Sequence, residues 1–399
     1  MSDDPKTRAT ITLLPGHQKR AEGGHPWIYS NEIAMDAATK ALPAGGLVTI
    51  RKADGKGLGV ATFNPHPLVS ARLLSRDATQ KIDRTFLTRA MRRALALRER
   101  LFAEPCYRLI HAEADGLPGL VVDRFDKALV CQFNTAGMAL LEADVLAALD
   151  QLVGPEIIVL RNDSPARLAE GLTDEVRVVK GDVPALVEFL ENGARFYADL
   201  RGGQKTGWFF DQRANRRFMS RLARDGRVLD LYTYAGGFAV QAALAGAREV
   251  TGIDRSEAAL ALAKEAAARN GVAERCTFRR GEAFAEMERL GQEDERFDVV
   301  IADPPAFIKT KKDVGAGLRG YRKLAHLAGA LVAKGGFLFL ASCSHNAELP
   351  AFAEAIRRGI ADTGRAARVL RTSGADADHP VHPALPESAY LKAQIFLLD

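Results

Sequence analysis

Cysteine is scarce in this sequence of 399 residues, with four in total, at positions 106, 131, 276 and 343. None of them forms a C-x-x-C pair or another zinc-ligand spacing, so the sequence predicts neither a disulfide framework nor a metal site. Proteins of reducing compartments rarely keep disulfides. The cysteine pattern therefore favours a reducing compartment.

Long apolar runs are also missing, because no stretch reaches the roughly 18 uninterrupted apolar residues of a transmembrane helix. The first residues, MSDDPKTRATITLLPG, are partly acidic and lack the apolar segment of a signal peptide. We therefore expect a cytoplasmic protein with no membrane partner. Its length predicts two to three domains of about 150 residues each.

Basic residues are unevenly distributed along the chain. The formal net charge is +5, but residues 1–100 contain 17 Lys and Arg against 9 Asp and Glu, a net of +8, which leaves −3 for residues 101–399. A basic N-terminal quarter on a nearly neutral body indicates a polyanionic partner. A solvated basic surface without a partner is the alternative.

Three regions differ in their local patterns. The first has short β-type runs separated by Gly and Pro, typical of a small β-barrel or sandwich. The arginine-rich residues 81–102 have apolar side chains at helical spacing and predict a helix that leads into a second, α/β region. We expect domains at 1–78, 79–190 and 191–399.

The third region alternates regularly between strand and helix patterns. Its strand candidates are RVLDLY, EVTGID, CTFRRG, FDVVIADPP, GFLFLASCS and ARVLRT. Strands separated by helices predict a doubly wound α/β fold, with a parallel sheet and helices on both faces. The last run, YLKAQIFLLD, follows a loop instead of a helix, so we expect that strand to be antiparallel.

Ligands of doubly wound sheets bind beyond the carboxyl ends of the strands, so the residues directly after each strand are the site candidates. These residues are Asp230 and Gly236 after the first strand, Asp254 after the second, Glu282 after the third, Asp303 after the fourth and Cys343 after the fifth. Glycine in the first turn lets the backbone approach a ligand closely. Each residue alone is weak evidence; Asp254, for example, could equally be a helix cap or a surface charge.

The first turn distinguishes two classes of cofactor. Asp254 follows Asp230 by about 24 residues, which fits one strand, helix, strand unit ending in a ribose-binding acid. A nicotinamide cofactor needs G-x-G-x-x-G to hold its pyrophosphate, but Tyr232 and Tyr234 occupy two of those glycine positions. S-adenosylmethionine has no phosphate, so fewer glycines suffice, and the proline pair after Asp303 would stiffen a loop beside the methyl donor. We therefore expect S-adenosylmethionine.

Cys343 ends a hydrophobic strand between two serines. A free cysteine is most often a small buried residue, which is one interpretation of Cys343. A nucleophilic thiolate at the site is the other.

Motifs along the whole chain point to one family. In order they are QKRAEGGHPWIYSNEI, DGLPGLVVDRF, KTGWFFDQRANR, LDLYTYAGGF, DPPAF, GYRKLAHLA, SCS and ADHPVHPALPESAYLK. Together they resemble the bacterial ribosomal RNA large subunit methyltransferase I family. The sequence departs from the usual methyltransferase pattern in its YTYAGG turn and in Glu282, where many methyltransferases have aspartate.

The resemblance implies a class I methyltransferase that makes 5-methylcytosine in 23S ribosomal RNA, with an N-terminal PUA RNA-binding barrel and a middle α/β domain. It implies S-adenosylmethionine as cofactor and 23S ribosomal RNA as partner, and it leaves a homodimer open. The expected cofactor-binding residues are Gln212, Asp230, Tyr232, Gly236, Asp254, Glu282, Asp303 and Pro304.

Methylation of cytosine carbon 5 gives Cys343 a chemical role. Carbon 5 becomes nucleophilic only after attack on carbon 6, for which a thiolate is suited. We expect Cys343 to make this attack while Asp303 supports N3. The base that removes the carbon 5 proton is not evident; His345 is one candidate, and a structural histidine is the alternative.

Basic residues in two regions are candidates for RNA contact. In the loop before and within GLRGYRK, Lys309, Lys311, Lys312 and Arg319 could contact phosphates, which position RNA without reading its sequence. A flexible solvated loop is the alternative. In the N-terminal domain Arg20, His25 and Trp27 could form an RNA face, although Trp27 could equally belong to the core.

Two other functions stay open. An RNA N-methyltransferase acting on guanine N7 or an exocyclic amine would start from a nitrogen lone pair and need no cysteine. A non-catalytic RNA-binding protein would bind no cofactor. Amine methylation typically uses a proline pair followed by an aromatic residue, whereas here Ala306 separates Pro305 from Phe307.

Overall fold

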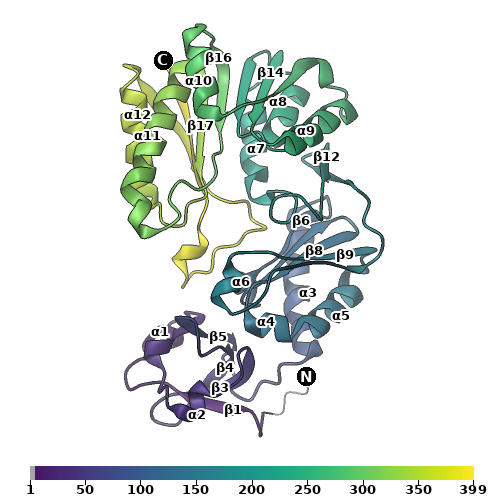
Figure 1. Cartoon of the computed structure of the whole chain (residues 1–399), viewed down its shortest axis with the longest axis vertical. Helices are drawn as coiled ribbons and strands as arrows, with labels where there is room; N and C mark the ends of the chain where they lie inside the picture. The colour runs from purple at the N-terminus through teal and green to yellow at the C-terminus, as the bar shows by residue number, and fades with distance from the viewer. Residues whose placement is uncertain (1–4) are drawn as a thin grey trace. The chain divides into compact units, whose positions relative to one another are not determined.

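The computed structural model describes residues 5–399, which pack as two compact units (Figure 1). Unit 1 comprises the chain up to Val187 together with Asp199–Trp208 and Asp378–Ser388. Unit 2 comprises Glu188–Ala198, Phe209–Ala377 and Ala389–Asp399. Two short segments of the predicted 191–399 domain thus pack with unit 1. The predicted boundaries at 78 and 190 stay a proposal.

The first sheet of unit 1 has five strands in the order β1-β3-β4-β5-β2. They are β1 (Ala9–Thr12), β2 (Trp27–Tyr29), β3 (Gly46–Arg51), β4 (Gly57–Phe63) and β5 (Val69–Ser75). Ile11, Ile50 and Phe63 lie in its core. The sequence indicated β1, β3, β4 and β5 as short β-type runs. It did not indicate β2, because three residues are too few to show an alternation of apolar and polar side chains.

The second sheet of unit 1 has the order β10-β9-β8-β7-β6. Its strands are β6 (Cys106–His111), β7 (Leu120–Phe125), β8 (Ala128–Phe133), β9 (Ile157–Asn162) and β10 (Glu175–Lys180). The helix predicted at 81–102 is α3 (Arg84–Leu101), which begins where the Asp83 carboxylate accepts a hydrogen bond from the Phe86 amide. Its apolar stripe packs with α5 (Glu142–Val153) in the core of this sheet.

Shorter helices complete unit 1. They are α1 (Lys19–Glu22), α2 (Ala37–Lys40), α4 (Ala136–Leu140) and α6 (Ala166–Ala169).

Unit 2 begins with the hairpin of β11 (Val187–Glu191) and β12 (Ala194–Ala198).

The main sheet of unit 2 has seven strands in the order β15-β14-β13-β16-β17-β19-β18. They are β13 (Arg227–Leu231), β14 (Glu249–Asp254), β15 (Cys276–Arg280), β16 (Phe297–Ala302), β17 (Val332–Ser342), β18 (Ala367–Ser373) and β19 (Lys392–Leu398). The β13, β14, β15, β16 and β17 ladder is parallel, and β19 is antiparallel to both β17 and β18. The predicted doubly wound fold with an antiparallel last strand is confirmed.

Helices cover both faces of this sheet (Figure 1). Contacts join α7 (Arg213–Ser220), α8 (Gly237–Leu244) and α9 (Glu257–Arg269) into one group, and α10 (Ala283–Gln292), α11 (Val314–Leu331) and α12 (Leu349–Ala361) into another. Because both faces are covered, the central strands are continuously apolar, as in VVIA of β16 and FLFLA of β17. The carboxyl ends of β13, β14, β16 and β17 therefore lie along one edge.

Candidate active site

Asp230 sits near the carboxyl end of β13 and is 1% exposed. Its Oδ2 accepts hydrogen bonds from the Thr233 hydroxyl at 2.6 Å and from the Ala239 amide of α8 at 3.0 Å. Its Oδ1 is buried and has no hydrogen-bond partner within residues 5–399. Buried polar atoms are nearly always paired, so this oxygen is available to a donor on a bound group.

Acidic groups act together at this edge of the sheet. The pKa of the Asp230 carboxyl is raised to about 7, above all by burial. The negative charges of Asp303 and Asp254 raise this pKa as well, while the two hydrogen bonds lower it. A positively charged ligand relieves such repulsion. The sulfonium and amino groups of S-adenosylmethionine have that charge, so these residues fit the cofactor.

The turn between β13 and α8 has an unusual backbone. Tyr232, Tyr234 and Gly236 have φ angles of 62°, 51° and 79°. A Cβ atom on Gly236 would lie 2.9 Å from the Ala263 Cβ of α9. The sequence predicted that this glycine lets a ligand approach closely. In the structure glycine is needed at position 236 because its own backbone is left-handed and because α9 leaves no room for a side chain.

Asp254 after β14 and Glu282 after β15 differ in their exposure and hydrogen bonds. Asp254 accepts hydrogen bonds from the Tyr234 amide at 3.0 Å and the Ser256 amide at 2.8 Å, which orient its half-buried carboxylate. Glu282 is exposed and caps α10, because its Oε2 accepts a hydrogen bond from the Ala285 amide at 2.9 Å. Asp254 is thus fixed at the sheet edge, whereas Glu282 already has a structural role.

Cys343 directly follows β17, next to the end of β16. Its thiol is half-buried, and Sγ lies 4.0 Å from the carbonyl oxygen of Pro304. Asp303, also half-buried, precedes Pro304 in the loop after β16. The structure therefore brings the predicted nucleophile, Cys343, against the DPP loop.

Tyr321 of α11 holds these two loops together. Its hydroxyl lies 2.7 Å from the Ser342 hydroxyl and 2.9 Å from the Ser344 hydroxyl, and the Ile308 amide donates to the Ser344 hydroxyl at 3.2 Å. The phenol ring also packs on Phe307, with ring centres 4.8 Å apart. Sequence reasoning missed Tyr321, although it lies inside the quoted motif GYRKLAHLA.

Lys392 is a second residue that sequence reasoning missed. It begins β19, pairs with Ser342 of β17 in the antiparallel register, and is 9% exposed. Its ammonium group donates to the carbonyl oxygens of Ser344 at 2.8 Å and Tyr390 at 2.9 Å. The available signal was a lysine at the start of a strand whose other residues, apart from Gln394, are apolar.

A polar group formed by residues before β13 and before β19 lies in unit 2. The Tyr390 hydroxyl donates to the Asp211 carboxylate at 2.5 Å, and the rings of His345 and Tyr390 are stacked with centres 5.4 Å apart. Gln212 is buried, with its Oε1 accepting from Asn215 at 2.6 Å. Its Nε2 has no hydrogen-bond partner in the described chain, so the predicted cofactor residue Gln212 keeps a free donor.

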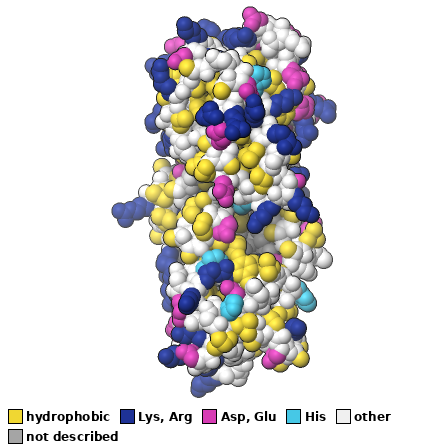
Figure 2. Space-filling model, turned by 90° about the vertical axis from the view of Figure 1, so that its left-hand side faces the viewer, with side chains coloured by type: hydrophobic (Ala, Val, Ile, Leu, Met, Phe, Trp, Pro, Cys, Tyr) yellow, Lys and Arg dark blue, Asp and Glu magenta, His cyan; other side chains and the backbone are white. Residues whose placement is uncertain are grey.

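The predicted RNA-contacting residues differ in exposure and in whether a carboxylate already pairs with them. Lys309, Lys311, Lys312 and Arg319 are all exposed around the start of α11. In unit 1 the Arg20 guanidinium pairs with Glu32 at 3.0 Å, and the Trp27 indole donates to Glu113 at 2.8 Å. His25 is buried, and its contact with RNA stays a prediction. Figure 2 shows Lys and Arg side chains scattered over the visible face among Asp and Glu.

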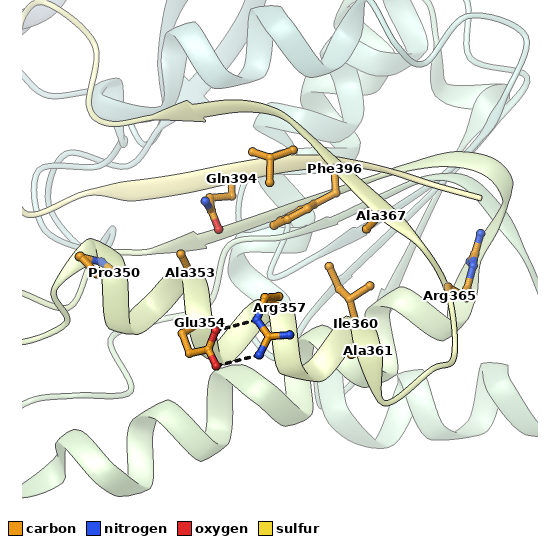
Figure 3. A pocket seen from close by; sticks show the side chains of 11 residues that line it. Pro350, Ala353, Glu354, Arg357, Ile360, Ala361, Arg365, Ala367, Gln394 and Phe396 are labelled. Carbon is orange, nitrogen blue, oxygen red and sulfur yellow. Dashed lines mark hydrogen bonds and ion pairs between the residues drawn. The ribbon is translucent and has the colours of Figure 1, made fainter.

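A groove of about 430 Å³ lies elsewhere in unit 2 (Figure 3). It is lined by residues of α12, β18 and β19, including Ile360, Ala367 and Phe396, and Glu354 at its rim pairs with Arg357. Asp230, Asp254, Asp303 and Cys343 do not line it. The groove is therefore separate from the candidate active site.

Two kinds of feature are absent from residues 5–399. Residues 5–399 contain no group of three or more His, Cys, Asp or Glu side chains that could hold a metal ion. Over the same range no helix is long and apolar enough to cross a membrane. The cytoplasmic location and the homodimer stay predictions.

Sequence comparisons reveal similarity across the chain. A model of S-adenosylmethionine-dependent methyltransferases matches residues 174–397, and a model of PUA-like domains matches residues 11–76. The ribosomal RNA large subunit methyltransferase I of Tolumonas auensis is 34% identical over 97% of this chain and 98% of its own length. That of Erwinia tasmaniensis is 35% identical over 96% and 97%.

Solved structures share the fold. A candidate SAM-dependent methyltransferase from Streptococcus mutans superposes with a TM-score of 0.82 over 98% of this chain and 100% of its own, at 19% identity. A candidate methyltransferase in complex with SAH superposes with a TM-score of 0.83 over 98% and 99%, also at 19% identity. Because each structure covers 98% of this chain, the similarity in fold includes residues of both units.

Proposed function

Because the chain belongs to the ribosomal RNA large subunit methyltransferase I family, we propose that it methylates carbon 5 of a cytosine in 23S ribosomal RNA. S-adenosylmethionine is its cofactor. The family name supports large-subunit ribosomal RNA as the substrate. The choice of carbon 5 is carried by one observation, the Cys343 thiol facing the Pro304 carbonyl across two neighbouring strand ends.

The proposed chemistry begins with Cys343. Its thiolate forms a bond to carbon 6 of cytosine, and the electron pair of the C5=C6 bond makes carbon 5 nucleophilic. Asp303, in its protonated form, donates to N3 as negative charge develops there. Carbon 5 then bonds to the methyl group that bound S-adenosylmethionine would supply, and the cofactor would leave as S-adenosylhomocysteine. Loss of the carbon 5 proton to a base then re-forms the C5=C6 bond, breaks the S–C6 bond and returns the thiolate.

The cofactor would be held by the residues at the ends of β13 and β14. The free Oδ1 of Asp230 accepts a donor, Asp254 provides the carboxylate for the ribose hydroxyls, and Gln212 has a free amide donor. Tyr232, Gly236 and Pro304 shape the backbone beside them. Glu282 contributes through its position as the cap of α10.

The RNA would be held by exposed cations. We assign phosphate contacts to Lys309, Lys311, Lys312 and Arg319, which surround the start of α11 near the Cys343 loop: the Asn346 side chain donates to the Lys309 carbonyl at 3.1 Å. Arg20 and Trp27 stay candidates in unit 1, where both already contact carboxylates.

Methyl transfer from labelled S-adenosylmethionine to undermethylated 23S RNA, with nucleoside analysis of the product, tests the proposal. Wild type is expected to yield 5-methylcytidine, and Cys343→Ala to lose at least about 1,000-fold in rate because no other group replaces a covalent nucleophile. Cys276→Ser, which changes the other half-buried cysteine, is the matched control and should keep full activity.

Three results would contradict this function. An N-methylated nucleoside as the product would favour nitrogen methylation, which needs no thiol. Full activity of Cys343→Ala would make Cys343 a packed strand-end residue. RNA binding by wild type without methyl transfer would instead support the non-catalytic alternative.

A further inference from the structure

Lys392 lies at the proposed nucleophile without an obvious structural reason for its charge. It starts β19 opposite Ser342, one residue before Cys343, and its side chain is nine-tenths buried. Its ammonium group bridges the carbonyl oxygens of Ser344 and Tyr390. Lysine is almost never buried to this extent unless it is paired with an acid.

Among residues 5–399, no carboxylate forms a salt bridge with this buried lysine. Over residues 5–399, both hydrogen bonds of the Lys392 ammonium go to neutral carbonyl oxygens. Burial lowers the pKa of Lys392, and the one opposing electrostatic influence comes from the Cys343 thiol. The geometry agrees, because Ser344, whose carbonyl Lys392 binds, is the residue next to Cys343.

Tyr321, Asp303 and His345 are titratable groups on the elements packed around the thiol. Tyr321 on α11 contacts both serines that flank Cys343, and burial raises the pKa of its phenol, which therefore stays neutral. Asp303 is in the loop whose Pro304 carbonyl faces the thiol; its side chain opposes a thiolate when ionised and is neutral in the protonated form that donates to N3. His345, in the loop of Cys343 itself, is exposed and stacks on Tyr390.

We propose that Lys392 is a positioning residue whose buried ammonium group stabilises the Cys343 thiolate and fixes the Cys343 loop through the Ser344 carbonyl. Attraction between opposite charges is mutual, so a thiolate that favours the ammonium is itself favoured by it. On ionisation the thiol proton goes to solvent, and Lys392 stays protonated. This inference rests on the proposed function, since it explains how the nucleophile becomes a thiolate.

Alkylation of Cys343 by iodoacetamide across pH 5.5–10, followed by peptide mass spectrometry, measures the thiolate directly and without methyl transfer. In wild type we expect the alkylation midpoint below the ordinary thiol value of about 8.5. In Lys392→Gln, which still donates to carbonyls but has no charge, we expect the midpoint to rise by about one pH unit and the rate at pH 7 to fall about tenfold.

Lys392→Arg is the matched control, because it restores a cation and should return most of the wild-type alkylation profile. A wild-type midpoint at or above about 8.5 would overturn the inference even if the variants did not fold. An unchanged midpoint in folded Lys392→Gln would also overturn it. Activity of Cys343→Ala decides the proposed function separately, since the alkylation profile of wild type and Lys392 variants does not depend on which base is methylated.

Discussion

The buried Asp230 carboxylate destabilises the folded protein whenever it is ionised. Its pKa of about 7 when folded exceeds the ordinary value of 3.8, so the folded state favours the protonated form. The resulting stability is greatest at acid pH and is lost as pH rises through about 7. A residue that costs stability at neutral pH is better explained by binding than by folding.

Asp230→Asn should therefore stabilise the protein without its cofactor. Asparagine still accepts the hydrogen bonds from Thr233 and Ala239 but never ionises. At pH 8 we expect the free energy of unfolding to rise by at most about 4 kcal/mol, with a smaller gain at pH 5.5. Urea unfolding at both pH values measures this, and calorimetry should show at least tenfold weaker binding of S-adenosylmethionine. A loss of stability that is equal at both pH values would contradict the argument.

Residues at strand ends could be predicted because a strand end is visible in the sequence. Asp230, Asp254, Asp303 and Cys343 each follow an apolar run, and the structure places all of them at one edge of the sheet. Lys392 and Tyr321 could not be found this way. Their contacts depend on the register of β19 against β17 and on the rotation of α11, which no local pattern encodes.

At the level of elements, strand and helix periodicity predicted the parallel main sheet of unit 2 with helices on both faces and an antiparallel last strand. Periodicity failed to indicate the short strand β2. It also failed to show where one apolar run is divided between two helices. The stretch MALLEADVLAALDQLVG, for example, belongs to α4 and α5, which meet at Leu141. Local periodicity is similar on both sides of such a break, so it cannot locate it.

The contact between α11 and α12 depends on a glycine. A Cβ atom on Gly359 of α12 would overlap the backbone carbonyl of Arg322 and lie 2.7 Å from the Ala325 Cβ. We expect Gly359→Ala to lower the free energy of unfolding by about 1–3 kcal/mol, because the two helices must move apart. Urea denaturation followed by circular dichroism would detect this.

Gly329 of α11 is the matched control for this substitution. A Cβ there would meet no atom closer than 3.7 Å, which is ordinary contact. Gly329→Ala should therefore stabilise the protein by up to about 1 kcal/mol through its helix propensity. Equal effects of the two substitutions would show that helix separation does not limit the packing.

At the level of the whole molecule, unit 1 is completed by distant parts of the sequence. The Arg98 guanidinium forms two hydrogen bonds with Asp115 and a third with the Asp378 carbonyl, while the Asp378 carboxylate accepts from the Arg108 amide. Chain length predicted several domains, and motif order predicted the family. Neither indicated that residues 378–388 would pack with unit 1, because that depends on buried partners far away in sequence.

This polar network predicts sensitivity to acid. Burial above all, together with the neighbouring charges of His379, Arg108 and Arg98, lowers the pKa of His111 to about 2, against the opposing carboxylate of Asp378. The unfolded chain takes up a proton near pH 6.5, whereas folded His111 stays neutral. The stability from His111 is thus present above pH 6.5 and is lost as pH falls below it.

His111→Asn tests this behaviour. In wild type the free energy of unfolding should fall by up to about 1.4 kcal/mol per pH unit between pH 6.5 and 5 through His111. The variant should show a shallower slope, even if it is less stable at every pH. His17→Asn, which alters an exposed histidine of unit 1, should keep the wild-type slope. An unchanged slope in His111→Asn would show that another group titrates.

The three-segment construction of unit 1 also has a consequence for synthesis on the ribosome. A nascent chain emerges from its N-terminus, so Arg98 and Arg108 leave the exit tunnel long before Asp378 does. Domains made of one continuous segment can fold as they emerge. Here the hydrogen bonds that the Arg98 guanidinium and the Arg108 amide form with Asp378 can be made only after nearly the whole polypeptide has been synthesised, so the first part of the protein to be translated is completed late.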